Sequence, residues 1–215
     1  MTYKEIYQGG QGEIVEKKSR FIATVKPVKT EEEAVNFINE TKKKYWDAKH
    51  NCSAFVLGKN QELNRCNDDG EPAQTAGRPM LDVLLKEGVT NVAVVVTRYF
   101  GGVLLGTGGL VRAYQKATKE GLLASQIIEV ISGKQIDIHT DYNGLGKLQY
   151  LFAQNKITVM DTIYEADVNI KILVPIEEVD AVTKSIISTT NGTAKIVEND
   201  DVSYALRDKE IIFQL

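Results

Sequence analysis

Hydrophobic residues follow two patterns along the chain. Short runs rich in Val, Ile and Phe are separated by longer segments in which apolar residues return every three or four positions. The short runs are typical of strands, and the longer segments are typical of helices with one buried face. In the first part of the chain the pattern predicts strands over residues 20–27, 51–57 and 92–96, and helices over residues 34–46, 79–87 and 110–117.

The second part of the chain shows a different order of elements. The pattern breaks at Ile131-Ser132-Gly133, and the strand and helix signals that follow have the order β-α-β-β-α-β. This order is the split βαβ arrangement of ferredoxin-like domains. Its strands are expected over residues 134–140, 157–163, 166–174 and 194–199, and its helices over residues 142–155 and 176–189. We therefore expect an α+β fold with two domains, residues 1–132 and residues 133–215.

One stretch of the first domain combines a buried strand, a glycine-rich loop and a helix. It reads VVVTRYFGGVLLGTGGLVRAYQK over residues 94–116. Glycines allow positive φ angles and close approach to the backbone, and a helix start presents unpaired N–H groups that attract anions. The alternative is that the glycines only allow strand, loop and helix to pack closely. The anion hypothesis places a phosphate or a nucleic-acid backbone at Arg98, Gly101, Gly102, Gly106, Thr107, Gly108, Gly109, Arg112 and Lys116.

This loop does not fit the two common nucleotide-binding motifs. A P-loop needs a Lys-Ser or Lys-Thr pair directly after its glycines, and no such pair follows here. A dinucleotide fingerprint that begins at Gly106 would need a glycine where Val111 stands. Both observations disfavour the binding of ATP or NAD.

A second candidate lies in the loop over residues 65–77. Asp68, Asp69 and Glu71 place three carboxylates within four residues, next to a glycine and a proline. Carboxylate oxygens bind hard cations such as Mg²⁺, so these three side chains would be the ligands of a metal site. Asp, Gly and Pro are also the usual residues of an ordinary turn. Both interpretations stay open at this point.

Composition restricts the class of protein. The chain is 43% hydrophobic and 26% charged, which is ordinary for a soluble globular protein. No apolar run approaches the roughly 20 residues of a membrane span, and the first residues lack the apolar core of a signal peptide. We therefore expect a cytoplasmic protein without a membrane segment. Cys52 and Cys66 are too few for a disulfide framework, and with His50 they lack metal-ligand spacing, which favours a buried thiol and a surface or hydrogen-bonded imidazole.

The net charge of −3 is unevenly distributed. Residues 1–132 carry 18 Lys and Arg against 16 Asp and Glu, a net charge of +2, whereas residues 133–215 carry 8 against 13, a net charge of −5. Domains that bind nucleic acid over a broad surface are strongly basic. Any RNA contact is therefore expected to be a local patch in the first domain.

Two motifs together resemble the hallmarks of the IMPACT family, in its bacterial, YigZ-like branch. They are NDDGEPAQTAGRPM over residues 67–80 and RYFGGVLLGTGGLVRAY over residues 98–114, and the resemblance extends over nearly the whole chain. It implies an N-terminal α/β sandwich like the second domain of ribosomal protein S5. It also implies a C-terminal ferredoxin-like domain like one of elongation factor G. Eukaryotic relatives regulate translation through a partner-binding RWD domain, and that interaction is not expected here because no segment of that size precedes the sequence.

The comparison with the ribosomal fold also implies that the two loops lie close together. The carboxylate loop and the glycine loop would then form one pocket. In this arrangement the cations Arg78, Arg98 and Arg112 would surround a pocket rimmed by Asp68, Asp69 and Glu71.

Three functions are compatible with these features. The first is a regulator of translation that binds RNA, the ribosome or a ribosome-associated partner through the glycine-rich loop. The second is a metal-assisted enzyme that acts on a phosphorylated small molecule, with Mg²⁺ held by the carboxylates, although no nucleophile–base arrangement is legible in the sequence. The third is a pure protein-interaction module whose exposed apolar loop consists of Tyr99, Phe100, Val103 and Leu104.

Overall fold

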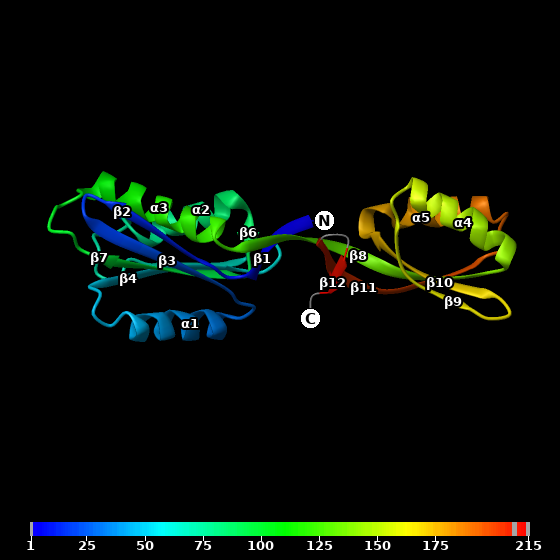
Figure 1. Cartoon of the computed structure of the whole chain (residues 1–215), viewed down its shortest axis with the longest axis horizontal. Coiled ribbons are helices and arrows are strands. Elements are labelled where there is room, and N and C mark those ends of the chain that lie inside the picture. The colour runs from blue at the N-terminus through cyan, green and yellow to red at the C-terminus, as the bar shows by residue number, and fades with distance from the viewer. Residues whose placement is uncertain (1, 208–209, 214–215) are drawn as a thin grey trace. The chain divides into compact units, whose positions relative to one another are not determined.

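The chain divides into two compact units, each built from helices and sheets (Figure 1). The structure is a computed structural model that describes residues 2–207 and 210–213. The first unit comprises residues 3–129, and the second comprises Thr2 together with the chain from residue 130 onward. The predicted α+β fold with two domains is confirmed.

The first unit is organised around an antiparallel sheet with the strand order β2-β3-β7-β4-β5. Helices α2 and α3 cover one face of this sheet, and α1 covers the other (Figure 1). A short parallel pair, β1 with β6, adds to the unit. The elements are β1 (Thr2–Gln8), β2 (Gln11–Glu16), β3 (Ser19–Pro27), α1 (Glu31–Lys44), β4 (His50–Leu57), β5 (Leu63–Asn67), α2 (Gly77–Glu87), β6 (Val89–Thr90), β7 (Val92–Tyr99) and α3 (Thr107–Leu123).

The central position of β7 accounts for the uninterrupted apolar run in its sequence. Val92, Val94 and Val96 face the core shared with α2 and α3, whereas Ala93 and Val95 face the core shared with α1. All five side chains are fully buried. A strand covered on both faces needs an apolar side chain at every position, as the sequence pattern predicts.

Helix α1 begins and ends where local signals predict. The Thr30 hydroxyl accepts a hydrogen bond from the Glu33 backbone N–H at 3.1 Å, which satisfies one of the unpaired donors of the first turn. Acidic residues occupy that first turn, and the lysines of residues 42–44 occupy the last. Both sets of charges match the helix dipole.

Two strands extend beyond the prediction. Strand β5 occupies part of the segment 65–77 that the sequence assigns to a loop, because its exposed polar residues give no apolar alternation to detect. Strand β8 (Gln126–Thr140) starts eight residues before the expected strand and continues through Gly133. The ring of Tyr204 lies 2.5 Å from the position that a side chain on Gly133 would occupy, so packing across the sheet explains the glycine.

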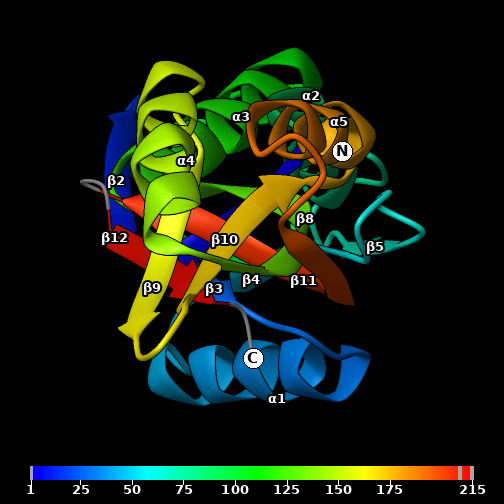
Figure 2. The ribbon, with the colours of Figure 1, turned by 90° about the vertical axis from the view of Figure 1, so that its right-hand side faces the viewer.

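The second unit contains an antiparallel sheet in the order β9-β10-β8-β11-β12 with α4 and α5 packed on it (Figure 2). The order β8-α4-β9-β10-α5-β11 confirms the predicted β-α-β-β-α-β pattern. The core lies between this sheet and the two helices. The bounds are α4 (Tyr142–Gln154), β9 (Thr158–Tyr164), β10 (Val168–Pro175), η1 (Ile176–Glu178), α5 (Val179–Thr189), β11 (Lys195–Arg207) and β12 (Glu210–Phe213).

In residues 2–207 and 210–213, no helix has both the length and the apolar character needed to span a bilayer.

Neighbouring isoleucines on α5 test the position of this core. Ile186 is fully buried, whereas 47% of the Ile187 side chain is exposed. Ile186→Ala should lower the free energy of unfolding by about 2–5 kcal/mol because it leaves a cavity, and Ile187→Ala should change it by less than about 0.5 kcal/mol. Denaturant unfolding followed by circular dichroism measures both variants. Equal losses for the two would contradict the placement of α5.

Candidate functional site

The carboxylate loop and the glycine loop line one cavity of about 470 Å³ in the first unit. This finding confirms the expected proximity of the two loops. The cavity lies where β4 begins, β7 ends and α3 begins. Its lining residues are Lys49, His50, Gly70, Glu71, Pro72, Arg98, Phe100, Leu104, Leu105, Gly106, Thr107 and Leu110.

The first carboxylate, Asp68, acts as a cap for helix α2. Its two oxygens accept hydrogen bonds from the backbone N–H groups of Gln74 at 2.8 Å, Ala76 at 3.0 Å and Gly77 at 2.8 Å. These donors belong to the loop and the first turn of the helix, which has no capping side chain at its own N-cap residue. Asp68 therefore supplies the cap from a distance in sequence.

The second carboxylate, Asp69, connects the loop to α1 and β4. Its oxygens pair with the Lys42 ammonium at 2.6 Å and accept from the Asn51 backbone N–H at 2.7 Å. The residue has a φ of 44°, a left-handed conformation that non-glycine residues rarely adopt. In this conformation its carbonyl oxygen lies 2.9 Å from Nδ1 of His50.

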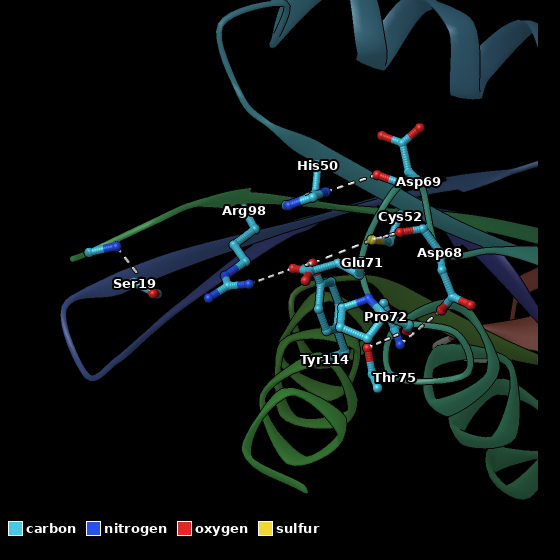
Figure 3. Close-up of polar contacts among 12 residues, drawn as sticks. Ser19, His50, Cys52, Asp68, Asp69, Glu71, Pro72, Thr75, Arg98 and Tyr114 are labelled. Atoms are coloured by element: carbon cyan, nitrogen blue, oxygen red, sulfur yellow. Dashed lines mark hydrogen bonds and ion pairs between the residues drawn. The ribbon is translucent and has the colours of Figure 1, made fainter. Parts of the chain in front are cut away.

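The third carboxylate, Glu71, is buried and faces the cavity floor. Its Oε1 lies 2.6 Å from Nη1 of Arg98 and accepts a hydrogen bond from the Tyr114 hydroxyl at 2.8 Å (Figure 3). The three carboxylates thus have three separate sets of partners. The described part of the chain contains no cluster of three or more His, Cys, Asp or Glu side chains that could hold a metal ion. The structure does not bring Asp68, Asp69 and Glu71 together as ligands.

The Arg98–Glu71 ion pair is almost completely buried, with side chains 7% and 3% exposed. The Arg98 guanidinium also lies over two aromatic rings, 5.4 Å from the centre of the Phe21 ring and 5.6 Å from that of the Phe100 ring. Its Nε is buried and has no hydrogen-bond partner within the described structure. Arg98 therefore lines the cavity, but most of its charge is balanced by Glu71.

The network continues from Glu71 into the core. The Cys52 thiol donates a hydrogen bond to the backbone carbonyl oxygen of Asp68 at 3.0 Å, and its sulfur lies 3.3 Å from the Tyr114 oxygen. Burial raises the pKa of Cys52 to about 12, and burial together with the nearby Cys52 raises the pKa of Tyr114. Both groups stay protonated, so that Tyr114 donates to the carboxylate. The predicted buried thiol and hydrogen-bonded imidazole are confirmed for Cys52 and His50.

The contact of His50 with the Asp69 carbonyl fixes the tautomer of its ring. A carbonyl oxygen can only accept a hydrogen bond, so Nδ1 must carry the proton. In the neutral imidazole, Nε2 is then an acceptor directed away from Asp69 (Figure 3). His50 therefore adds an oriented acceptor to the cavity wall.

Among the residues that the structure describes, no side chain caps the first N–H donors of α3. Its N-cap residue is Gly106, no side chain caps it, and no acidic residue lies in the first turn. Gly102 and Gly106 have φ angles of 82° and 72°, and nothing lies within 4 Å of where a side chain would be. The backbone there is open to a ligand, as the anion hypothesis requires.

Other glycines of the loop serve packing instead. A side chain on Gly101 would meet the Lys18 carbonyl carbon at 2.0 Å, and the Gly101 N–H lies 3.2 Å from the Ser19 hydroxyl. A side chain on Gly109 would lie 3.0 Å from Leu105. Gly108 is exposed and faces Arg112. Both interpretations of the glycines therefore apply, each to different positions.

Three predicted cations lie away from the cavity. Arg78 is exposed and forms an ion pair with Asp82 at 2.8 Å, one turn along α2. Arg112 and Lys116 line a second pocket, described below. The expectation that Arg78 and Arg112 surround the cavity is wrong, because their positions on α2 and α3 direct them to other surfaces.

Several cavity residues carry no signal in the sequence. Lys49 precedes a strand as an ordinary polar residue, and Leu105 lies between the glycines as one of several apolar residues. Tyr114 is fully buried and supports the cavity through its hydrogen bond to Glu71 rather than lining it. Its position fits the apolar face of α3, and only its hydroxyl distinguishes it from a core residue. A polar tip on a buried helix face is the signal that could have identified it.

Comparison with known proteins finds a matching domain family for each of the two parts of the chain. Residues 17–122 match the Impact N-terminal domain, and residues 138–193 match a Domain of unknown function (DUF1949). IMPACT family member YvyE of Bacillus subtilis is 40% identical, with 93% of this chain and 92% of that protein covered. IMPACT family member YigZ of Escherichia coli is 32% identical, with 84% and 90% covered. The crystal structure of a hypothetical protein, 29% identical, superposes with a TM-score of 0.58 and covers 93% of this chain and 98% of that chain.

The chain belongs to the IMPACT family. The similarity extends to eukaryotes through the Protein IMPACT homolog of Dictyostelium discoideum, which is 40% identical over 47% of this chain and 29% of its own length.

The buried ion pair can be tested by removing one charge or both. Arg98→Met should lower the free energy of unfolding by about 3–5 kcal/mol, because it leaves the Glu71 carboxylate buried without its cation. Adding Glu71→Gln, which removes the remaining charge, should restore part of this loss. Denaturant unfolding of the single and double variants measures the coupling. A double variant no more stable than Arg98→Met would contradict the pairing.

The two cysteines should differ in reactivity. Iodoacetamide at pH 8 should modify the exposed Cys66 and leave the buried Cys52 unmodified until the protein is unfolded, as mass spectrometry would show. Burial also raises the pKa of Cys66, so its reaction should be slower than that of a free thiol. Modification of Cys52 in the native protein at the rate of Cys66 would contradict its burial.

The pKa of Cys52 also predicts a pH dependence. The folded thiol keeps its proton to about pH 12, whereas the unfolded thiol ionises near its ordinary value of 9.0. The unfolded state therefore binds fewer protons in this window, and stability falls as the pH rises from 9 towards 12. Cys52→Ala should make the fall in stability with pH less steep, by up to about 1.4 kcal/mol per pH unit. An unchanged slope would contradict the raised pKa.

Proposed function

We propose that this member of the IMPACT family is a cytoplasmic, translation-associated protein that binds RNA, with one nucleotide held in the cavity of the first unit. Membership of the family is consistent with a role in the regulation of translation. The observation that carries the proposal is the composition of the cavity. It joins apolar walls, an open helix start and an oriented hydrogen-bond acceptor in about 470 Å³, which are the features that a base, a phosphate and a ribose require.

The apolar part of the cavity suits a nucleobase. Phe100 is 54% exposed and Leu104 is 81% exposed, although both belong to the lining. Exposed aromatic rings are the stacking surfaces of proteins that bind single-stranded nucleic acid, and each stacked base contributes about 1–3 kcal/mol. Leu110 and Pro72 complete the apolar wall.

The helix start suits a phosphate. The first N–H groups of α3 have no capping side chain, and the Gly106 and Thr107 backbone lies on the cavity wall. The Lys49 side chain is exposed and lines the same cavity. A positive helix end with a nearby ammonium group is favourable for an anion. This contact is local, so it is compatible with a chain whose net charge is −3.

The acceptor on His50 favours RNA over DNA. In the neutral ring Nε2 has a free lone pair, because Nδ1 is committed to the Asp69 carbonyl at 2.9 Å. A ribose 2′-hydroxyl can donate to such an acceptor, and a deoxyribose has no corresponding group. The proposal therefore includes a preference for RNA.

A negative charge introduced at the helix start tests the proposal without disrupting the fold. Thr107 is exposed and is the first residue of α3, where an acidic side chain matches the helix dipole and stabilises the helix. Thr107→Asp should thus keep or raise the melting temperature but weaken RNA binding about tenfold or more. Thr107→Asn is the matched neutral control and should bind nearly as well as the parent protein.

The measurement is fluorescence anisotropy with a labelled single-stranded RNA over a series of salt concentrations. The logarithm of the binding constant should fall by about 0.7 per phosphate contact for each tenfold increase in salt concentration. The same sequence as DNA should bind more weakly. Absence of salt-dependent RNA binding at low salt, or equal losses in the Asp and Asn variants, would refute the proposal. If RNA does not bind while a Phe100→Ser variant loses a protein partner, the cavity rim is a protein-interaction surface instead.

A further inference from the structure

A second pocket lies beside the first, and the proposed function leaves it unassigned. It has a volume of about 240 Å³ and is formed by the turn between β2 and β3 and by the exposed side of α3. Leu105 lines both pockets and forms a shared wall between them. The lining consists of Glu16, Lys17, Leu105, Gly109, Arg112, Ala113 and Lys116.

We propose that this second pocket binds the next phosphate along the same RNA strand, held by Lys17, Arg112 and Lys116. The inference rests on the proposed function, because it extends the path of the RNA from the cavity across Leu105. It also gives separate roles to cations that the sequence pattern places in a single site. Arg98 and Lys49 belong to the first pocket, and the three cations named here belong to the second.

The charges in the second pocket are not balanced by the protein. Lys17, Arg112 and Lys116 are all exposed, and none forms an ion pair with an acidic group in the described ranges 2–207 and 210–213. Glu16 is the one acidic residue that the pocket contains, so three positive charges face one negative charge. By contrast, Arg20 and Arg65 of the same unit each pair with a glutamate. An anion between the three cations would relieve their repulsion.

The arrangement on α3 is unfavourable for the helix alone. Arg112 and Lys116 are separated by four residues and share one face of α3, where like charges repel. The Arg112 guanidinium also extends back towards the helix start, since its Nη1 lies 3.7 Å from the position that a side chain on Gly108 would occupy. A cation near the positive end of a helix is destabilising unless an anion lies between them. Both costs fall when a phosphate binds.

The position of Lys17 is set by the backbone rather than by a flexible loop. Lys17 and Lys18 have φ angles of 44° and 67°, so two consecutive non-glycine residues adopt the left-handed conformation. Gly101 packs against the Lys18 carbonyl, and the Gly101 N–H contacts the Ser19 hydroxyl. These two contacts hold the turn against the glycine loop. The turn that presents Lys17 is therefore attached to the loop that closes the first cavity. The two pockets form one connected surface.

Ligands of different length distinguish binding at one pocket from binding at both. Uridine 5′-monophosphate can fill only one pocket, whereas a hexauridylate can reach both. The double variant Arg112→Ala/Lys116→Ala should leave the affinity for the mononucleotide unchanged and lower the affinity for the hexauridylate about tenfold. It should also reduce the salt slope of hexauridylate binding by about 0.7, the value for one phosphate contact on a single strand. Fluorescence anisotropy and competition measure both ligands.

The control removes two charges elsewhere in the same unit. Lys43→Ala/Lys44→Ala takes two exposed lysines from the end of α1, outside both pockets, and should leave all affinities within twofold. The Arg112→Ala/Lys116→Ala protein should melt at the same or a higher temperature than the parent, because it loses a repulsive pair. A normal melting temperature excludes misfolding as the cause of weaker binding.

Each contrary outcome has a distinct meaning. If hexauridylate binds the parent and is weakened by Thr107→Asp but not by Arg112→Ala/Lys116→Ala, the second phosphate site is refuted and the proposed function stands. If the double variant loses as much affinity for the mononucleotide as for the hexauridylate, the two pockets act as a single site and the inference is overturned. If neither ligand binds the parent protein, the proposed function itself fails.

Discussion

The buried ion pair between Arg98 and Glu71 is the interaction on which the site depends. It joins the end of β7 to the carboxylate loop, and the Tyr114 hydroxyl adds α3 to the same carboxylate. Burial of two charges is costly unless both are paired and hydrogen-bonded, so the three elements can move apart only by exposing or orphaning a charge. The cavity exists because these elements are held together at their ends. The pair thus has a structural role before it has any role towards a ligand, which makes Arg98 a poor choice for testing binding.

The carboxylate loop illustrates how a concentration of charge can serve structure. Asp68 caps α2, Asp69 binds Lys42 and orients His50, and Glu71 neutralises Arg98. Adjacent side chains on an irregular loop point in different directions, so closeness in sequence does not imply a common ligand. A metal site needs ligand oxygens that converge on one point. The carboxylates of Asp68, Asp69 and Glu71 instead contact partners on separate elements. Their shared effect is to fix the loop that forms one wall of the cavity.

The sequence predicts the fold better than the site, for physical reasons. The uninterrupted apolar run on β7 and the apolar stripe on α3 both follow from burial, because β7 is covered on both faces and α3 on one. The meeting of the two loops follows from family resemblance, and the motif contains Tyr114 without revealing its hydrogen bond. The direction of each cation depends on its angle around a helix. Arg78 pairs with Asp82 one turn along α2, a contact that the i,i+4 spacing allows. The direction of Arg112 towards its own helix start depends on the surface around α3, which spacing alone does not specify.

The two pockets make the proposed RNA binding compatible with an acidic chain. Several cations of the first unit, Arg20, Lys29 and Arg65 among them, are paired with carboxylates and contribute little to the electrostatic potential. The pockets instead collect Lys49, Lys17, Arg112 and Lys116 next to a helix start without a cap. What attracts a phosphate is the local excess of unpaired positive charge within about one Debye length, roughly 8–10 Å at physiological salt. Charges on distant parts of the chain are screened over that distance, so the net charge of −3 does not decide the matter. The proposed RNA contact therefore depends on a few side chains around α3 and does not require a basic surface elsewhere on the chain.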